Sequence, residues 1–396
     1  MVRMRPYFRL GRTLSGYPTG PVRPHRSMPP ASHPEVTPVK YVGIDVHKKM
    51  CQVAVIDDDG ELLDETRFRN TLEGIEEFAQ RLTGFNDEVR GVVESTGNLW
   101  IQVHDRLEAH GIDVALSNPA NSRLITEARL KTDKTDARAL ARLLRAGVLS
   151  TCYVPGEEQR SRRELLRHRL KLVKIRTEVR NRIHALLDKH GLRIPYKTKF
   201  SKKAVAWLKM QSLGFMDNAI LRSDIALLEV LDEQIGLVEE KIAALAADDQ
   251  QVHLLMTMTG IGYFTAMLIL AEIGTIDRFS SDKRFSSWMG LAPIVHQSGE
   301  KTRVGGVGGP GNRRLRWVMI QCAHNARRYD PRLMRFYERY SRRKGEKSAV
   351  VAVAHEMARI IYFMLKRNEP YRGMREGLTE RKIKEMKRRA LHGLRN

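Results

Sequence analysis

The chain has 396 residues, of which 42% are hydrophobic, so it is long enough to bury the cores of two or three domains. Its net charge of +23 favours a polyanionic partner, and nucleic acid is the first expectation. No apolar run reaches the ~18 residues of a membrane span and no concentrated basic amphipathic helix is evident, so no membrane partner is expected. The three cysteines are far apart and form no CxxC pair, which argues against a zinc site or a disulfide framework and suits a reducing cytosol.

The first 38 residues are rich in Arg, Pro and Ser, contain almost no acid and show no apolar period. They also lack the apolar segment of a secretory signal. We expect either a disordered basic arm or a start site placed too early, with the true start near Met28.

Residues 39–150 predict an α/β domain. Three strands come first, and helices and strands then alternate, which is typical of a mixed sheet with helices on its faces. The expected strands are 41–46, 52–56, 61–68, 91–94 and 113–116, and the expected helices are 71–82, 98–110 and 136–146.

Residues 151–250 predict a long helical, coiled-coil region. Apolar residues recur every seven positions from Leu165 to Leu186, and a 3-4-3-4-3 apolar spacing runs from Leu228 to Leu245. Two long helices joined by a basic loop at 191–200 are implied. The second helix either pairs inside the chain as a helical hairpin or forms a dimerisation arm.

Residues 251–372 predict an all-α C-terminal domain. The expected parts are a helix–turn–helix at 258–266, a polar helix at 281–289, a Gly-rich loop at 299–311, and helices at 313–329 and 349–366. Residues 373–396 form a basic helix or tail.

Four acidic residues occupy positions that suit a metal site. Asp45 ends the first strand, Glu94 closes a later strand, and Asp133 and Asp136 share one face of the first turn of a helix. Each one alone is more commonly a cap or turn residue, but together they would repel without a cation. Oxygen-only ligands suit Mg²⁺ or Mn²⁺, and two such ions can clamp a phosphodiester during displacement. The sequence therefore predicts a metal-binding acidic cluster.

Two further segments suit contact with nucleic acid. The turn Gly260-Ile-Gly262 resembles a helix–hairpin–helix element, whose backbone N–H groups meet DNA phosphate; a plain helix connector is the alternative. Residues 301–328 contain seven basic residues and no acid. Ser298 stands beside a glycine just before them and could attack a phosphate or merely contact one. The basic candidates for phosphate binding are Lys301, Arg303, Arg313, Arg314 and Arg316.

From about residue 40 to 367 the chain resembles the DEDD-type transposases of bacterial insertion sequences, the one-hundred-and-ten family. The resemblance rests on residues 41–48 around Asp45, 93–97 around Glu94, 131–138 around Asp133 and Asp136, then 260–262 and 290–299. In place of the family's Ser/Thr-Lys-x-Gly element the chain has Gly308–Asn312, so the contacts of that lysine and hydroxyl are in doubt.

The resemblance implies a RuvC-like, ribonuclease-H-type domain that binds Mg²⁺ through the four acids. It implies that Ser298 attacks the scissile phosphate and forms a covalent phosphoserine–DNA intermediate, which a DNA hydroxyl later resolves. It also implies a noncoding bridge RNA that pairs with target and donor DNA, and a cytoplasmic, nucleoid-associated location in a bacterium. Homodimers would assemble into homotetramers, with each active site shared between the acids of one subunit and the serine of another.

Two other functions fit the same residues. A RuvC-like nuclease would hydrolyse DNA with metal-activated water and without the serine. A non-catalytic, basic DNA- or RNA-binding protein would use the acids only as helix caps and surface charges.

Overall fold

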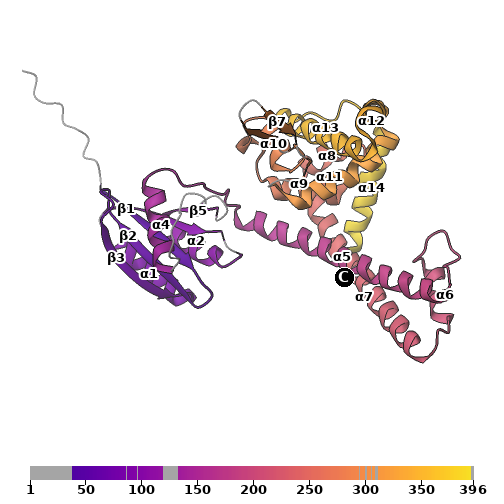
Figure 1. Ribbon diagram of the computed structural model, residues 1–396, viewed down its shortest axis with the longest axis horizontal. Coiled ribbons are helices and arrows are strands. Elements are labelled where there is room, and N and C mark those ends of the chain that lie inside the picture. Colours follow the sequence, from indigo (N-terminus) through magenta and orange to yellow (C-terminus); the bar gives the residue numbers. More distant parts are fainter. Residues whose placement is uncertain are drawn as a thin grey trace, which may run out of the picture. The chain divides into compact units, whose positions relative to one another are not determined.

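A computed structural model describes residues 38–393, apart from Asn86, Thr96, 119–132, Ile294, 299–300, Gly305 and 308–310. Within that range the side chains of 133–134, 295–298, 301–304 and 393 are also outside the description. The expectation of a basic arm therefore falls almost wholly outside the described residues. The chain divides into two compact units, Met1–Val154 and Pro155–Asn396 (Figure 1).

The first unit is built on a five-stranded mixed sheet. The strands are β1 (Val39–Val46), β2 (Met50–Ile56), β3 (Leu62–Arg69), β4 (Glu88–Glu94) and β5 (Asp113–Ser117), in the order β3-β2-β1-β4-β5. β1, β2 and β3 pair antiparallel, whereas β4 is parallel to β1 and β5 is parallel to β4. The predicted mixed sheet with five strands is confirmed.

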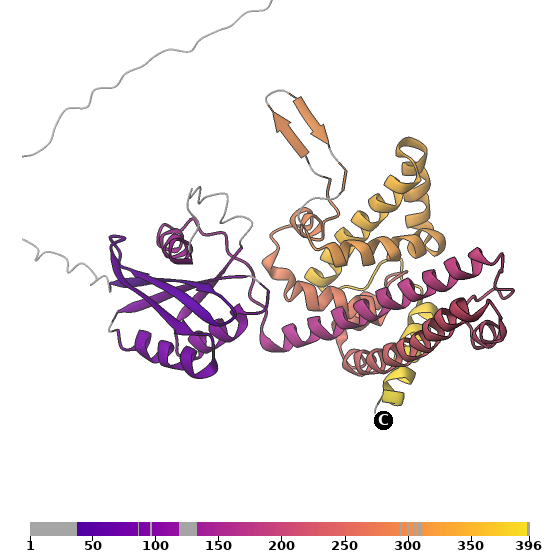
Figure 2. The ribbon, with the colours of Figure 1, turned by 60° about the horizontal axis from the view of Figure 1, so that its bottom comes forward.

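Helices cover both faces of this sheet (Figure 2). The helices α1 (Leu72–Thr83) and α2 (Trp100–Ala109) share a hydrophobic core with Val42, Ile44 and Val46 of β1. Because side chains alternate along a strand, Gly43 and Asp45 face the other way, toward α4 (Asp133–Arg145). α4 comes so close that a Cβ on Gly43 would lie 2.0 Å from the carbonyl oxygen of Ala137. A glycine is therefore required where the helix crosses β1.

The second unit begins with a helical hairpin. The helices α5 (Glu157–Lys189) and α7 (Phe215–Ala246) run antiparallel, and the short α6 (Lys202–Met210), which the sequence did not predict, packs near the closed end. Ion pairs between Arg182 and Asp224 and between Arg176 and Asp232 link the two long helices. Within the described residues the apolar stripe of α7 therefore packs against α5. Of the two arrangements that the sequence left open, this is the intramolecular helical hairpin.

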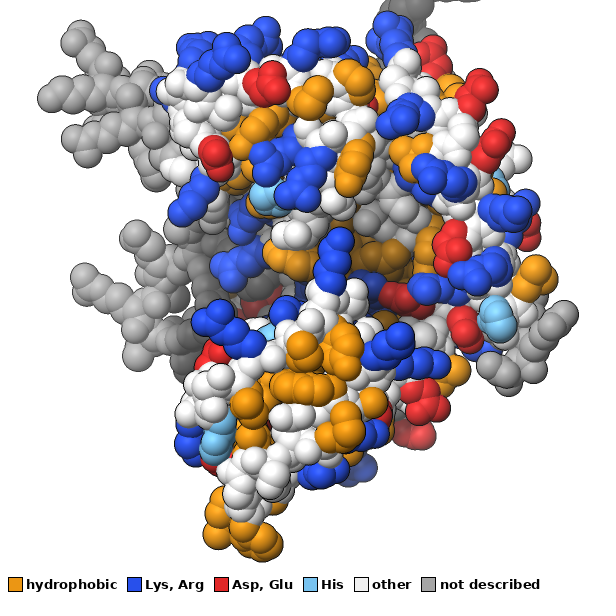
Figure 3. Space-filling model, turned by 90° about the vertical axis from the view of Figure 1, so that its right-hand side faces the viewer, with side chains coloured by type: hydrophobic (Ala, Val, Ile, Leu, Met, Phe, Trp, Pro, Cys, Tyr) orange, Lys and Arg blue, Asp and Glu red, His pale blue; other side chains and the backbone are white. Residues whose placement is uncertain are grey.

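The closed end of this hairpin exposes apolar side chains. Met210, Phe215 and Met216 are 73%, 85% and 72% exposed. Figure 3 shows hydrophobic side chains gathered at this lower tip, whereas Lys and Arg prevail over the upper part of the same face. Large contiguous apolar surfaces of this kind commonly contact other proteins.

The remaining helices form a body around α13 (Glu346–Arg367). Its other elements are α8 (Gln250–Met256), α9 (Tyr263–Ile273), η1 (Ile276–Arg278), α10 (Asp282–Trp288), α11 (Arg313–Tyr329), α12 (Pro331–Lys344) and α14 (Glu376–Gly393). Leu166 and Ile242, from the open end of the hairpin, belong to the same core as α13. Among the described helices only α13 is long and apolar enough to cross a membrane, but about 56% of its apolar window is buried, as in a core helix.

Two segments differ from their expected form. The predicted Gly-rich loop at 299–311 is partly a hairpin, in which β6 (Val295–Ser298) pairs with β7 (Lys301–Val304) and Ser298 lies opposite Lys301. The loop prediction was wrong for β7 because Val295, Thr302 and Val304 are β-branched, which favours strand pairing. The basic C-terminal residues form the helix α14, and Met386 on that helix is fully buried.

Candidate metal centre and nucleic-acid interface

Asp45 and Glu94 lie at matching positions on neighbouring strands. The parallel register of β1 and β4 pairs Ile44 with Val93, and the next residue on each strand is the acid. Ile44 and Val93 both belong to the core beneath the sheet, so the two acids share the opposite face, the one covered by α4. The structure thus brings two of the four predicted acids to one edge and one face of the sheet.

Asp45 is partly enclosed. Its side chain is 16% exposed, and the ring nitrogen Nε2 of the half-exposed His47 lies 3.1 Å from its Oδ2. On the other side the register places Gln52 of β2. Gln52 is buried and fixed, because its amide donates to the carbonyl of Thr66 and accepts from Arg67 Nε at 2.7 Å. The carboxylate of Asp45 therefore stands on a rigid strand end with limited access to solvent.

Asp133 and Asp136 lie in the first turn of α4. Asp136 is half-buried and precedes Ala137, the residue in contact with Gly43, whereas the side chain of Asp133 lies outside the described residues. Arg138 holds this helix to β3 by donating to Glu65 Oε2 at 2.8 Å. The helix start is therefore fixed over the face that carries Asp45 and Glu94.

The residues fit a hard divalent cation by the type of their donor atoms. Carboxylate oxygens are the ligands that Mg²⁺ and Mn²⁺ prefer. Among the described residues, however, no group of three or more His, Cys, Asp or Glu side chains is close enough to hold an ion. The strand register places Asp45 and Glu94 on one face of the sheet, but within the described residues no third acidic side chain completes a site with them.

The two glycines of the predicted helix–hairpin–helix turn have different surroundings. Gly260 has a φ of +89°, and a Cβ there would lie 2.7 Å from the carbonyl oxygen of Cys322 on α11. Gly262 precedes α9, and a Cβ there would meet nothing within 4 Å. Gly260 therefore serves the packing of the turn on α11, while Gly262 leaves the start of α9 open.

A lysine from far along the chain supports this turn. Lys382 on α14 donates from Nζ to the carbonyl oxygens of Met256 and Met258 at 2.7 and 2.8 Å. Burial lowers the pKa of Lys382 to about 8. Sequence reasoning missed this residue because it lies in a segment that reads as a basic tail.

The backbone places Ser298 at the end of β6, paired with Lys301 of β7. The side chains of Ser298, Lys301 and Arg303 lie outside the described residues. The base of the surrounding segment is closed, because the N–H of Asn312 donates to the carbonyl of Trp288 at 2.9 Å. Ser298 therefore belongs to a segment whose two ends, at Trp288 and Asn312, are joined by a backbone hydrogen bond.

A buried acid organises the base of this loop. Glu272 of α9 is 2% exposed and accepts from Arg167 Nε and Nη2 at 2.8 and 2.9 Å and from Asn312 Nδ2 at 2.9 Å. Burial alone would raise the pKa of Glu272, but hydrogen bonds and charge from Arg167, with Arg163 nearby, hold it below its usual value. Sequence reasoning missed Glu272 because it stands in an apolar run.

Asn312 also begins α11, since its side chain accepts from the backbone N–H groups of Arg314 and Leu315 at 3.1 Å. Arg313 and Arg314 in this first turn are exposed. Arg316 instead lies against the loop, with Nη1 3.5 Å from the carbonyl oxygen of Gly290. Of the predicted phosphate ligands on α11, Arg313 and Arg314 are thus the accessible ones.

Comparison with known proteins gives two family matches. Residues 42–191 match a model described as a transposase of the DEDD, IS110 type, and residues 252–338 match the model described as the transposase IS116/IS110/IS902 family. Together the matches span more than half of the chain and contain all four acids, the Gly260–Gly262 turn and Ser298.

Individual relatives resemble the chain over most of its length. It is 29% identical to the transposase for insertion sequence element IS1111A of Coxiella burnetii, over 84% of this chain and 92% of that protein. It is 28% identical to the putative transposase y4qE of Sinorhizobium fredii, over 74% and 73% of the two chains. A pilin gene-inverting protein of Moraxella bovis is 25% identical, over 84% and 97%.

Proposed function

This chain belongs to the IS110/IS116 family of DNA transposases, and from that premise we propose that it cuts and rejoins DNA with its acidic cluster and Ser298. The observation that carries the proposal is the placement of Asp45 and Glu94 at matched ends of two parallel strands, beneath the start of α4. The sheet order, with three antiparallel strands followed by two parallel ones, supports a RuvC-like, ribonuclease-H-type domain.

In this proposal Asp45, Glu94, Asp133 and Asp136 hold Mg²⁺ or Mn²⁺. The bound ion would supply electrophilic stabilisation of the charge that develops on the scissile phosphate. The role of the chain is to keep the carboxylates in place: β1 and β4 fix Asp45 and Glu94, and Arg138 fixes α4.

Ser298 is the proposed nucleophile. Its hydroxyl gives up its proton as Oγ attacks the scissile phosphorus; a P–Oγ bond forms, the ester bond to one sugar oxygen breaks, and that oxygen takes up a proton in exchange. A DNA hydroxyl then attacks the phosphoserine, which restores a phosphodiester and the serine hydroxyl. Arg313 and Arg314, with Lys301 and Arg303, would neutralise phosphate charge near the serine, and Gly262 would offer a backbone contact.

The proposed partners are target and donor DNA, a noncoding bridge RNA, and further copies of the chain. The net charge of +23 supports a polyanionic partner, and the exposed apolar tip of the hairpin supports a protein contact. A homodimer that assembles into a homotetramer in the bacterial cytoplasm, associated with the nucleoid, completes the proposal.

The test of the nucleophile is a covalent adduct between protein and end-labelled DNA that survives denaturation. Ser298→Ala should abolish the adduct while DNA binding persists, and Ser280→Ala, at an exposed serine elsewhere in the same unit, should leave it intact. An adduct that persists in Ser298→Ala would contradict the assignment. Strand cleavage in Ser298→Ala without an adduct would point to a water-hydrolysing nuclease.

The test of the acidic cluster is strand cleavage with and without metal. Asp45→Ala should abolish cleavage, whereas Asp59→Ala, at an exposed acid in the turn between β2 and β3, should not. Full activity in EDTA would exclude the metal role. Binding without any strand breakage, under all metal conditions, would indicate a non-catalytic nucleic-acid-binding protein.

A further inference from the structure

An arginine-rich groove lies between α12, α13 and the segment after α13, away from the loop of Ser298 in the sequence. Two adjoining cavities, of about 290 and 580 Å³, share Arg332, Glu356 and Arg359 in their walls. The arginine groove is defined here by its six arginines, Arg332, Arg335, Arg339, Arg359, Arg367 and Arg372.

The groove is strongly cationic. Its walls hold six arginines and only two acids, Glu356 and Glu369. Glu356 is shared between Arg332 at 3.6 Å and Arg359 at 3.2 Å, and Arg359 also pairs with Asp282 at 2.6 Å. Within the described part of the chain, the remaining four arginines form no ion pair, and all four are exposed. Such an excess of positive charge suits phosphate groups and disfavours an uncharged ligand.

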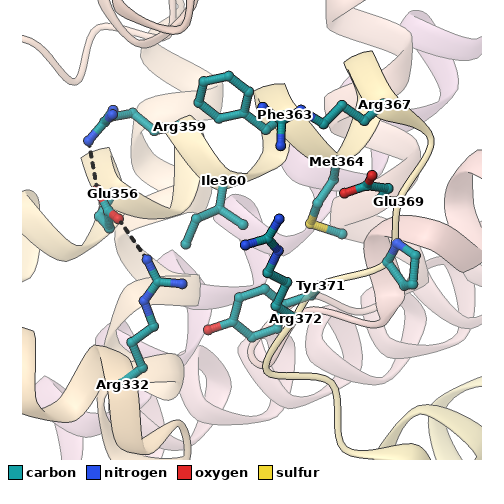
Figure 4. Close-up of a pocket in the computed structure, with 11 residues that line it drawn as sticks. Arg332, Glu356, Arg359, Ile360, Phe363, Met364, Arg367, Glu369, Tyr371 and Arg372 are labelled. Carbon is teal, nitrogen blue, oxygen red and sulfur yellow. Dashed lines mark hydrogen bonds and ion pairs between the residues drawn. The ribbon is translucent and has the colours of Figure 1, made fainter.

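The floor of the groove is apolar and aromatic. Ile360, Phe363 and Met364 of α13 line it, and Figure 4 shows Arg372 reaching toward Ile360 and Met364 while Arg332 reaches Glu356. Phe363 is 37% exposed, and the guanidinium of Arg367 lies 5.0 Å from the centre of its ring. Aromatic rings and arginine planes are the surfaces on which unpaired bases stack.

The wall is held in place before any ligand binds. Tyr371 is buried and donates from its hydroxyl to Asp330 Oδ2 at 2.9 Å, which ties the segment after α13 to the start of α12. Asp330 in turn accepts from the backbone N–H groups of Arg332 and Leu333 at 3.0 Å. Because the shape is preorganised, binding would not have to order the wall.

We propose that the arginine groove binds unpaired nucleotides of a single-stranded nucleic acid, with a base on the apolar floor and phosphates on the arginines. The smaller cavity lies near the lower end of the range of ligand pockets, roughly 300–1,000 Å³. A duplex would have to unstack and expel a base to fill it, which costs a few kcal/mol. The inference rests on the proposed function only in that the chain acts on nucleic acid.

The test is fluorescence anisotropy of the full chain with a labelled 12-nucleotide single strand, as RNA and as DNA, and with the corresponding DNA duplex. Arg367→Gln with Arg372→Gln should weaken single-strand binding about tenfold and reduce the salt slope by about 1.4, since each lost phosphate contact contributes about 0.7. The matched control, Lys203→Gln with Arg222→Gln, removes two exposed cations from the hairpin and should do neither.

A second pair of variants tests the stacking surface without a change of charge. Phe363→Ala should weaken single-strand binding about fivefold or more. Tyr153→Ala, at a 38% exposed tyrosine of the first unit, should have no such effect. Thermal unfolding confirms that each variant is folded.

The inference is overturned if the groove variants bind single strands as the controls do, or if duplex binding falls equally. If the groove variants lose affinity only for the RNA strand, the groove binds a guide strand. If they lose affinity for both the RNA and the DNA strand, the groove binds any unpaired strand. Neither result depends on Ser298, because the covalent-adduct assay tests the proposed function separately.

Discussion

Gly43 sets how closely α4 approaches the sheet. A Cβ at this position would lie 2.0 Å from the carbonyl oxygen of Ala137 and 2.6 Å from the backbone nitrogen of Ala141, so the helix backbone would have to move. We predict that Gly43→Ala destabilises the first unit by about 1–3 kcal/mol, the usual cost of overpacking, and lowers strand cleavage more than DNA binding. The reason for the second effect is that Asp136 moves with the helix.

Urea unfolding and cleavage of end-labelled DNA measure the two effects. Gly236→Ala is the control, since this helical glycine in α7 has open space around it and an alanine there should be neutral or stabilising by up to about 1 kcal/mol. If Gly43→Ala cleaves as well as the wild type, the close approach of α4 is not what positions the acids.

The individual site residues that could be predicted from the sequence are those with a recognisable local sequence pattern. Asp45 and Glu94 interrupt apolar runs at strand ends, so their placement follows from the strand pattern alone. Glu272 and Lys382 could not be found in this way, because Arg167 lies 105 residues from Glu272 and the Met256 carbonyl 126 from Lys382. Their roles depend on tertiary packing that no local pattern records.

Among the elements, Glu272 joins three helices through one carboxylate. Arg167 belongs to α5, Glu272 to α9, and Asn312 begins α11. The network therefore couples the hairpin, the core of the body and the base of the loop that carries Ser298.

We predict that Glu272→Gln destabilises the second unit by about 1.5–3 kcal/mol, the range for a hydrogen bond to a charged group. The pKa of Glu272 is lower in the folded chain than its ordinary value of 4.5, so its stabilisation is complete above about pH 4.5. This stabilisation is lost as the pH falls through the lower pKa that Glu272 has in the folded chain. The stability difference between wild type and variant should therefore be largest above about pH 4.5 and should narrow in more acidic solution.

Urea unfolding at pH 7 and at several acidic pH values measures this difference. Glu385→Gln removes an exposed acid that pairs with Arg388 within α14, and it should change stability little at any pH. If the stability difference between wild type and Glu272→Gln stays constant down to pH 3, the negative charge of Glu272 is not what stabilises the network.

Elements with a strong apolar period were predictable, and those without one were not. α11 was predicted with the bounds that the structure gives, 313–329, because its buried residues recur at helical spacing. α12 was missed because Leu333 is its only buried residue among many basic ones. The β6–β7 hairpin was hidden by the surrounding glycines, and the arginine groove joins residues of α12 to residues up to 40 positions later.

For the molecule as a whole, the acids and the serine belong to different compact units. Asp45, Glu94 and Asp136 lie in the first unit and Ser298 lies in the second. Under the proposed mechanism both sets must meet the same phosphate. The acids and the serine therefore meet either within one copy of the chain or between two copies.

We predict that two inactive variants restore activity when mixed. A Ser298→Ala copy retains intact acids, and an Asp45→Ala copy retains the serine, so one composite site in a mixed dimer would be complete while the other lacks both groups. Covalent adduct formation should therefore return in the mixture, at a fraction of the wild-type level, although each variant alone forms none. The control mixture, Ser298→Ala with the double variant Ser298→Ala and Asp45→Ala, contains no intact serine and should stay inactive. If the first mixture also stays inactive while the two variants demonstrably co-assemble, each site draws its acids and its serine from a single copy.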